Sequence, residues 1–206
     1  LNRSLFVPFI RMLEQRLEVV RLDARTDYRL EKLAGAEVYL TPDDARAAAE
    51  MAAVFARLTG GARAHPTEIR VKGRDVVLPV TAQGVAWASF ADLCDKPLGA
   101  ADYLAIAQDF HTVLIAGVPV MGQDRRNEAK RFITLIDVFY ENGFKTVSPL
   151  VAPAHDLYKG TSGAEVFEFD RTVSRLIEMR SQEYLARPHG RSTDVEAESS
   201  TGIVET

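Results

Sequence analysis

The fold is decided by residues 112–151, which begin with the apolar run Thr112-Val113-Leu114-Ile115-Ala116 and end with Lys145-Thr146-Val147-Ser148-Pro149-Leu150-Val151. The first run is typical of a strand that is buried on both faces. Between the two runs, residues 124–142 repeat apolar side chains at the spacing of a helix. Strand, long helix and strand form a βαβ unit, whose two strands we expect to be parallel and adjacent. The pattern therefore predicts an α/β fold.

Signals on both sides of this unit predict further helices and strands. Towards the amino terminus we expect a helix that starts at Ser4 and a short strand over residues 17–22. A helix start at Thr41-Pro42-Asp43-Asp44, with Thr41 as the N-cap, is expected to end at Gly60-Gly61. The remaining predictions are a hairpin of residues 68–71 and 75–80, a strand within residues 83–90, helices over residues 91–95 and 100–110, and a last helix from Asp170 to Ala186 with Val173, Leu176, Ile177 and Tyr184 on its buried side.

The composition limits the class of protein. The chain has 206 residues and a net charge of −4, which argues against a general binder of nucleic acid or anionic membranes. Cys94 is the only cysteine, which excludes an intrachain disulfide, and the four histidines have no ligand-like spacing, so we expect no metal site. No apolar run approaches the ~18 residues of a membrane-spanning helix.

The two ends of the chain carry their own signals. Leu1 is not a start methionine, and Leu1-Asn2-Arg3 leads directly into the first expected helix. We therefore expect this sequence to be the C-terminal part of a longer protein. Residues 187–206 are polar and acidic and lack periodic apolar side chains, so we expect a disordered tail there.

Two arginines are candidates for binding a phosphate. Arg3 precedes a helix start, where it would act as an arginine finger on a neighbouring subunit; the alternative is a solvated arginine or a salt bridge near the helix cap. Arg131 stands in the first turns of the long helix, where it would sense a γ-phosphate. Its alternative role is to pair within its own helix with Asp124, Asn127 or Glu128. The sequence contains no G-x-x-x-x-G-K-[ST] loop to cradle that phosphate.

Other charged residues favour structural roles. Asp137 lies between apolar neighbours and is expected to pair with a buried cation rather than to act as a general base. Arg171 and Arg175 are four residues apart on the last helix, one turn from each other. With Glu178 they predict an ion-pair ladder along that helix.

The remaining residues with reactive or aromatic side chains indicate no active site of their own. Lys72-Gly73-Arg74 at the hairpin tip resembles a nucleic-acid-binding wing, although two charges on a turn are usually only solvated. Trp87 and Phe90 favour the core over stacking on bases. Neither Cys94 nor Tyr103 has a base placed in the sequence to suggest nucleophilic chemistry.

Three segments together are more specific than any single motif: residues 90–104, the run KRFITLIDVFYENG of residues 130–143, and residues 171–185. With residues 1–10 they strongly resemble the ZapE family of P-loop AAA+-type ATPases, which act in bacterial cell division and have relatives in mitochondria. The resemblance covers residues 1–186, which leaves only the tail outside it.

The resemblance implies ATP hydrolysis, with Mg²⁺, in a ring-forming homo-oligomer. It also implies association with the division protein FtsZ in the bacterial cytoplasm, at the division site, with peripheral contact to the inner membrane. Arg3 matches the position of the arginine finger in AAA+ proteins. Arg131 matches an arginine of the family's lid-side motif, although Lys130 stands where an arginine is usual. The family's Walker A loop, Walker B acids and first sensor lie upstream of these residues, so we expect the chain alone to be inactive.

On this resemblance we expect three regions. Residues 1–40 would be C-terminal elements of a P-loop NTPase core of the AAA+ type. Residues 41–186 would form an α/β region with a helical lid, a β-hairpin insertion and a C-terminal helix, and residues 187–206 would be the acidic tail. Residues 113–158 also follow the layout of a Walker B half. Because Ala116 and Gly117 stand where the acids would be, we expect a degenerate copy that binds no magnesium.

Two other classes of function remain open. One is a non-enzymatic protein-interaction module that uses the hairpin at residues 72–74 or the segment 92–104 as its contact surface. The other is a nucleic-acid binder of the winged-helix kind, with the same hairpin as its wing.

Overall fold

A computed structural model describes residues 7–9, 12, 16, 39–40 and 44–189. Within these residues, six strands form one mixed sheet in the order β1-β6-β5-β4-β3-β2. The four strands on one side of the sheet are parallel to one another, namely β1 (Tyr39–Leu40), β6 (Lys145–Pro149), β5 (Thr112–Ala116) and β4 (Val85–Ser89). The sheet continues antiparallel through β3 (Arg74–Ala82) and β2 (His65–Val71).

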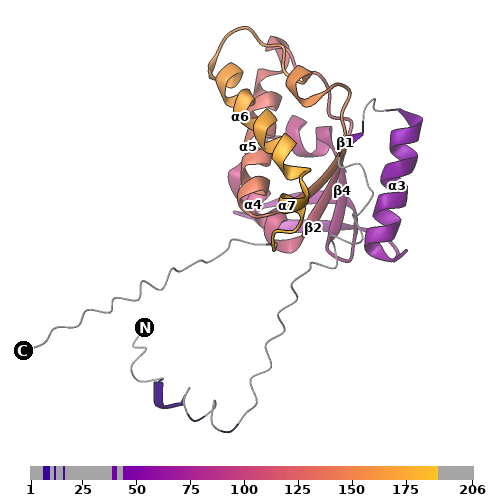
Figure 1. Cartoon of the computed structure of the whole chain (residues 1–206), viewed down its shortest axis with the longest axis vertical. Helices are drawn as coiled ribbons and strands as arrows, with labels where there is room; N and C mark the ends of the chain where they lie inside the picture. Colours follow the sequence, from indigo (N-terminus) through magenta and orange to yellow (C-terminus); the bar gives the residue numbers. More distant parts are fainter. Residues whose placement is uncertain (1–6, 10–11, 13–15, 17–38, 41–43, 190–206) are drawn as a thin grey trace, which may run out of the picture.

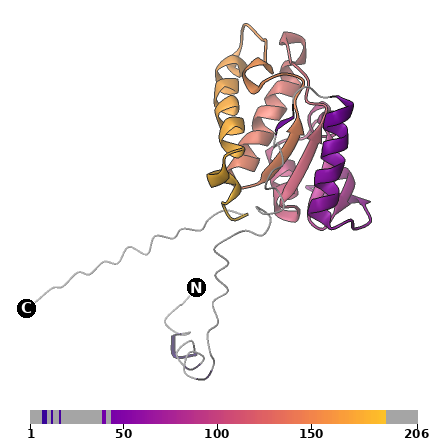
Figure 2. The same ribbon diagram turned by 45° about the vertical axis from the view of Figure 1, so that its right-hand side comes forward.

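Helices cover both faces of the sheet (Figure 1). Helix α3 (Ala45–Thr59) lies on one face, and α4 (Ala100–Asp109) and α5 (Arg126–Glu141) lie on the other. Helix α6 (Ala164–Met179) packs against α5, and the short helix α7 (Gln182–Leu185) follows it. Figure 2 shows the sheet between α3 and the α5–α6 pair. No helix in this part of the chain is long and apolar enough to cross a bilayer.

The β5–α5–β6 unit has the predicted arrangement. Strands β5 and β6 are adjacent and parallel, with Thr112 opposite Lys145 and Leu114 opposite Val147. Every residue of β6 is buried, and so is every residue of β5 except Ala116, because helices cover both faces at this point. The prediction of two adjacent parallel strands is confirmed. The predicted long helix is present as α5, preceded by the 3-10 turn η2 (Gln123–Arg125).

Two tight turns build the antiparallel part of the sheet. Lys72 and Gly73, with φ of 47° and 85°, form the two-residue turn between β2 and β3. Gln83 and Gly84, with φ of 49° and 71°, repeat this conformation between β3 and β4. Such left-handed pairs match the twist of the flanking strands. The predicted hairpin and the strand that follows it are therefore confirmed.

Helix α3 begins later than predicted. Its N-cap is Asp44 rather than Thr41, because the Asp44 carboxylate accepts hydrogen bonds from the backbone N–H groups of Arg46 at 2.9 Å and Ala47 at 3.0 Å. The predicted end is confirmed, since Gly60 adopts a left-handed conformation that its lack of a side chain permits.

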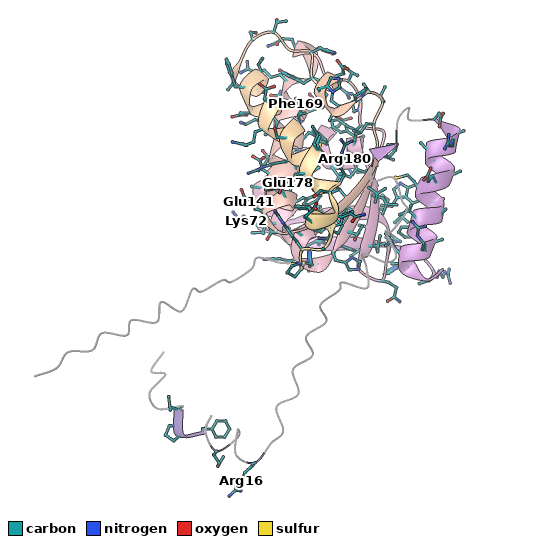
Figure 3. All side chains as sticks on the ribbon, in the orientation of Figure 1. Arg16, Lys72, Glu141, Phe169, Glu178 and Arg180 are labelled. Atoms are coloured by element: carbon teal, nitrogen blue, oxygen red, sulfur yellow. The ribbon has the colours of Figure 1, made fainter. Side chains whose placement is uncertain are left out.

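Helix α6 begins earlier than predicted, at Ala164 rather than at Asp170. Its buried face is made of Phe169, Thr172, Leu176 and Met179, at helical spacing. Figure 3 shows Phe169 and Glu178 along this helix. Ile177, which was expected to be buried, is 47% exposed. The predicted single helix is thus two helices, α6 and α7, with Ser181 as the N-cap of the second.

Between β4 and α4 the chain forms a single turn of π-helix, η1 (Ala91–Asp95), where the sequence predicts a short helix. Another short turn, η3 (Ala154–Asp156), follows β6. The main core lies between the sheet and α4, α5 and α6, and a smaller one lies between the sheet and α3. The expected helix at Ser4 and strand over residues 17–22 fall mostly or wholly outside the described residues, as does most of the expected tail. The three predicted regions of the chain stay a prediction.

Candidate functional site

Arg131 lies in the second turn of α5, where it is bound to η1 and to its own helix. Its Nε donates a hydrogen bond to the backbone oxygen of Cys94, and its Nη2 lies 3.5 Å from the backbone oxygen of Asp95. The guanidinium also lies 3.6 Å from the Glu128 carboxylate. Glu128 is one of the partners that the sequence predicts. The two backbone contacts were missed, because only the folded chain brings η1 beside α5.

The other cations at the start of α5 also have partners. Arg126 Nε donates to the Glu165 carboxylate of α6 at 2.7 Å, and Lys130 pairs with Glu168 of the same helix. The backbone N–H of Glu165 and the Arg126 guanidinium hold the pKa of Glu165 below its usual value. Four cations within two turns at the positive end of a helix dipole are unfavourable unless carboxylates balance them. The acids of α6 supply part of this balance.

Arg3 lies outside the described residues, so its place relative to Arg131 is not established. The role of Arg3 as an arginine finger and the role of Arg131 as a phosphate sensor both stay predictions. Arg131 keeps donors for a further ligand, because a guanidinium has five N–H groups in a planar fork and its side chain is 23% exposed.

Asp137 pairs with two arginines of α6, as the sequence predicts in part. Arg171 Nη2 donates to one carboxylate oxygen at 2.6 Å, and Arg175 Nη1 contacts the other. Arg175 is the more buried of the two, with 18% of its side chain exposed, and it stacks over the Tyr140 ring at 4.8 Å. Asp137 therefore joins α5 to α6 and is not free to act as a base.

The predicted ladder along the last helix is wrong in its partners. Glu178 does not pair with Arg175; it accepts a hydrogen bond from the Tyr140 hydroxyl at 2.7 Å and pairs with Arg187 at 2.8 Å. The arginines of α6 point across to α5, because that helix offers the nearer carboxylates, Asp137 among them.

A buried lysine at the start of β6 was not predicted. Lys145 is 2% exposed, and its Nζ donates to the backbone oxygens of Tyr184 at 2.9 Å and Arg187 at 2.8 Å. The Tyr184 hydroxyl in turn reaches three backbone oxygens, at Phe139, Tyr140 and Phe144, at 3.2–3.3 Å. These bonds tie the C-terminal segment to the turn between α5 and β6. The only sequence signal was a lysine at the head of an apolar strand.

The loops that leave β5 and β6 at their carboxyl ends are hydrogen-bonded to each other. Met121 N donates to the Leu157 oxygen at 2.7 Å, and Lys159 N donates to the Met121 oxygen at 2.8 Å. Val118 and Leu150 form a further parallel bridge. The positions compared with Walker B acids, Ala116 and Gly117, lie at the start of this paired region. Among the described residues no group of three or more His, Cys, Asp or Glu side chains could hold a metal ion. The expected degenerate copy that binds no magnesium stays a prediction.

The hairpin tip is bound to the body of the protein. Arg74 Nε donates to the buried Asp102 carboxylate at 3.1 Å, and its Nη2 contacts the second oxygen. Asp102 also accepts from the backbone N–H of Gly99, at the start of α4. Of the two cations at the tip, Arg74 is thus held by a carboxylate, which weakens the nucleic-acid wing as an alternative.

Cys94 and Tyr103 are both fully buried. Burial raises the pKa of the Cys94 thiol and of the Tyr103 hydroxyl well above their usual values. The Tyr103 hydroxyl donates to the backbone oxygen of Leu93 at 2.9 Å. Because a thiolate or phenolate is the reactive form, neither group is a nucleophile at neutral pH in this state.

The sheet, with helices on both faces and mostly parallel strand pairs, defines a mixed α/β protein. A family model described as AFG1-like ATPase matches residues 1–188. The chain belongs to the AFG1-like ATPase family.

Curated relatives agree with this assignment. Cell division protein ZapE of Escherichia coli is 36% identical over 189 residues, which are 92% of this chain and 50% of that protein. Lactation elevated protein 1 homolog B of Danio rerio is 33% identical over 217 residues, covering 89% of this chain and 43% of the relative. An uncharacterized protein of Schizosaccharomyces pombe is 30% identical over 216 residues, covering 91% and 48%. The chain thus spans about half the length of the curated relatives it matches. No solved structure matches it.

Proposed function

We propose that this chain is the C-terminal portion of a ZapE-like ATPase, which binds and hydrolyses ATP together with a Walker A and Walker B half upstream. The observation that carries the proposal is the family match over residues 1–188, combined with a chain that covers half of ZapE. Residues 1–40 would complete the ATPase core, and residues 41–186 would form its lid region. The chain alone would bind ATP weakly and would not turn it over.

The proposed chemistry is in-line attack of water on the γ-phosphate at a site shared between subunits of a homo-oligomeric ring. Arg3 would stabilise the negative charge of the transition state from a neighbouring subunit. Arg131 would couple the position of α5 to the presence of nucleotide. Mg²⁺ would be bound mainly by the upstream half of the protein.

The relative's name supports a role in cell division, and we extend that role to this chain as part of the proposal. The protein would act in the bacterial cytoplasm at the division site, would contact FtsZ, and would associate peripherally with the inner membrane. Co-sedimentation of the full-length protein with FtsZ polymers tests this part separately from ATP turnover.

The ATPase proposal is tested with the full-length protein. We expect Arg3→Ala to lower kcat about 10³-fold while ATP still binds, since an arginine finger acts on the transition state. The control is Arg16→Ala, which removes an exposed arginine of the same N-terminal part of the chain and should leave turnover unchanged (Figure 3).

A mixing experiment tests whether Arg3 acts between subunits. Arg3→Ala protein mixed with a variant that cannot bind ATP should regain turnover, because each supplies what the other lacks. Unchanged turnover in Arg3→Ala with ATP bound would refute the finger. Absence of ATP turnover in the wild-type full-length protein would refute the ATPase and favour the protein-interaction module.

A further inference from the structure

The π-helical turn η1 connects the carboxyl end of β4 to α4 and lies against α5. Single turns of π-helix are rare and are frequent at functional sites. The last carbonyl groups of any helical turn need partners from outside that turn. In η1 the partners are Tyr103 of α4, which donates to the Leu93 oxygen, and Arg131 of α5, which contacts the oxygens of Cys94 and Asp95.

The first part of η1 is held by buried or multiple contacts. The Asp92 carboxylate accepts from both the backbone N–H of Ser89 at 3.1 Å and its hydroxyl at 2.6 Å, and Asp92 N donates back to that hydroxyl. One residue later, the Leu93 oxygen accepts from the fully buried Tyr103 hydroxyl. These contacts fasten η1 to β4 and α4 as far as Leu93.

The last part of η1 is held from the surface by two arginines of the α5 region. Arg131 Nε donates to the Cys94 oxygen, with its Nη2 3.5 Å from the Asp95 oxygen. Arg125 lies 3.5 Å from the Asp95 carboxylate, and both of those side chains are more than a third exposed. Exposed pairs of this kind contribute little to stability, because water and salt screen the charges. Lys96 Nζ also pairs with the Asp92 carboxylate at 3.0 Å, and the Cys94 side chain packs in the main core. Arg131 supplies the side-chain donors to the last two backbone oxygens of η1, those of Cys94 and Asp95.

We propose that Arg131 is the latch of a conformational switch: it holds the end of η1 closed against α5, and nucleotide binding releases it. The coupling to nucleotide rests on the proposed ATPase function, whereas the latch itself rests on the contacts above. A phosphate attracts a guanidinium more strongly than neutral carbonyl oxygens do, because the bond joins two charges. When Arg131 turns to a phosphate, the backbone oxygens of Cys94 and Asp95 lose this donor, while the Leu93 oxygen keeps its bond from Tyr103.

Cys94 reports the state of this switch. It is fully buried in the closed state and is the only cysteine of the 206 residues. Burial raises the pKa of its thiol, so exposure to water both opens access and favours the reactive thiolate. Opening of η1 therefore increases the rate at which Cys94 reacts with a thiol reagent.

The experiment measures alkylation of Cys94 by N-ethylmaleimide in the full-length protein, read by mass spectrometry of the peptide that contains it. Arg131→Ala should react at least 10-fold faster than the wild type without nucleotide, and Arg131→Lys should also react faster because it lacks the planar fork. Lys130→Ala is the matched control: it removes a neighbouring cation of α5 that pairs with Glu168 and not with η1, so its rate should stay at the wild-type value. Circular dichroism confirms that each variant remains folded.

The second arm adds a non-hydrolysable ATP analogue to the wild type, with binding measured separately by a fluorescent nucleotide. Faster alkylation with bound nucleotide supports the switch. If Arg131→Ala reacts no faster than the wild type, the latch is refuted. If nucleotide binds but the alkylation rate does not change, the coupling is refuted and the ATPase proposal stands. If no nucleotide binds, the ATPase proposal fails, and with it the coupling.

Discussion

The two faces of the sheet are covered by helices of different chemistry. Helix α3 contacts the sheet through Met51, Val54, Phe55 and Leu58, and its outer face is mostly exposed alanine. On the opposite face, α5 and α6 are joined by an apolar core and also by ion pairs along their length. Burial of apolar side chains alone holds α3 on the sheet, whereas ion pairs also contribute to the contact between α5 and α6. Salt and pH should therefore act on one face only.

The largest effect is expected from Met51→Ala on the α3 side. Met51 is fully buried, so the substitution removes apolar contacts and leaves a cavity that costs about 2–5 kcal/mol of unfolding free energy. Urea unfolding at 0.1 M and 1 M NaCl should give the same loss, because no charge is involved. Ala52→Ser, on the exposed side of the same helix, is the control and should change the stability by less than about 0.5 kcal/mol. A salt-dependent loss would break the comparison.

A smaller and salt-sensitive effect is expected from Asp137→Asn on the opposite side. The change leaves Arg171 and the half-buried Arg175 without their shared carboxylate, at a cost of about 1–3 kcal/mol. The loss should shrink at 1 M NaCl, since salt weakens ion pairs whose side chains are exposed, and Arg171 is 54% exposed. Asp170→Asn, an exposed acid of α6, is the matched control and should be nearly neutral. Equal losses in both variants would show that the ion pairs do not hold α5 to α6.

Tyr184→Phe should cost about 1 kcal/mol, because it removes one hydroxyl and leaves the oxygens of Phe139, Tyr140 and Phe144 with one donor fewer. The ring stays in place, so the stacking on Tyr140 at 5.4 Å is kept. Hydrogen exchange should quicken at the turn between α5 and β6 and remain unchanged in α3. Faster exchange throughout the protein would contradict a local role.

The smallest effect concerns pH and Glu165. Its own backbone N–H and the Arg126 guanidinium lower the pKa of Glu165 in the folded protein. The stability from this pair is present above the ordinary glutamate pKa of 4.5 and is lost as the pH falls through the lowered value, because the unfolded chain then binds the proton more readily. Glu165→Gln should therefore lose less Tm than the wild type when the pH falls from 6 to 3. Parallel curves for the two proteins would exclude this contribution.

The parts of the fold that depend on residues close together along the chain can be predicted from the sequence. The buried run of β5 and the hairpin around Gly73 are local signals, and both predictions are correct. The start of α6 was missed because Asp170 is a good cap residue, whereas the helix follows Gly163, at a φ of 99°, without a side-chain cap. The local sequence pattern alone does not decide whether the helix begins at Ala164 or at Asp170.

The candidate site was predictable only where its partners are close in sequence. Glu128, three residues from Arg131, was among the expected partners. The oxygens of Cys94 and Asp95 were not, since their separation from Arg131 along the chain is closed only by tertiary packing. The burial of Lys145 depends in the same way on Tyr184, which belongs to the last helix.

The hydrogen bonds between the loops after β5 and β6 have a consequence for protein engineering. Because Met121 bonds to residues on both sides of Tyr158, neither loop can be lengthened or displaced without releasing the other. The two loops form one mechanical unit. A fluorescent tag or an inserted domain placed in either loop would disturb the entry to both α5 and α6, so the tip of the β2–β3 hairpin at Lys72 is the better attachment point.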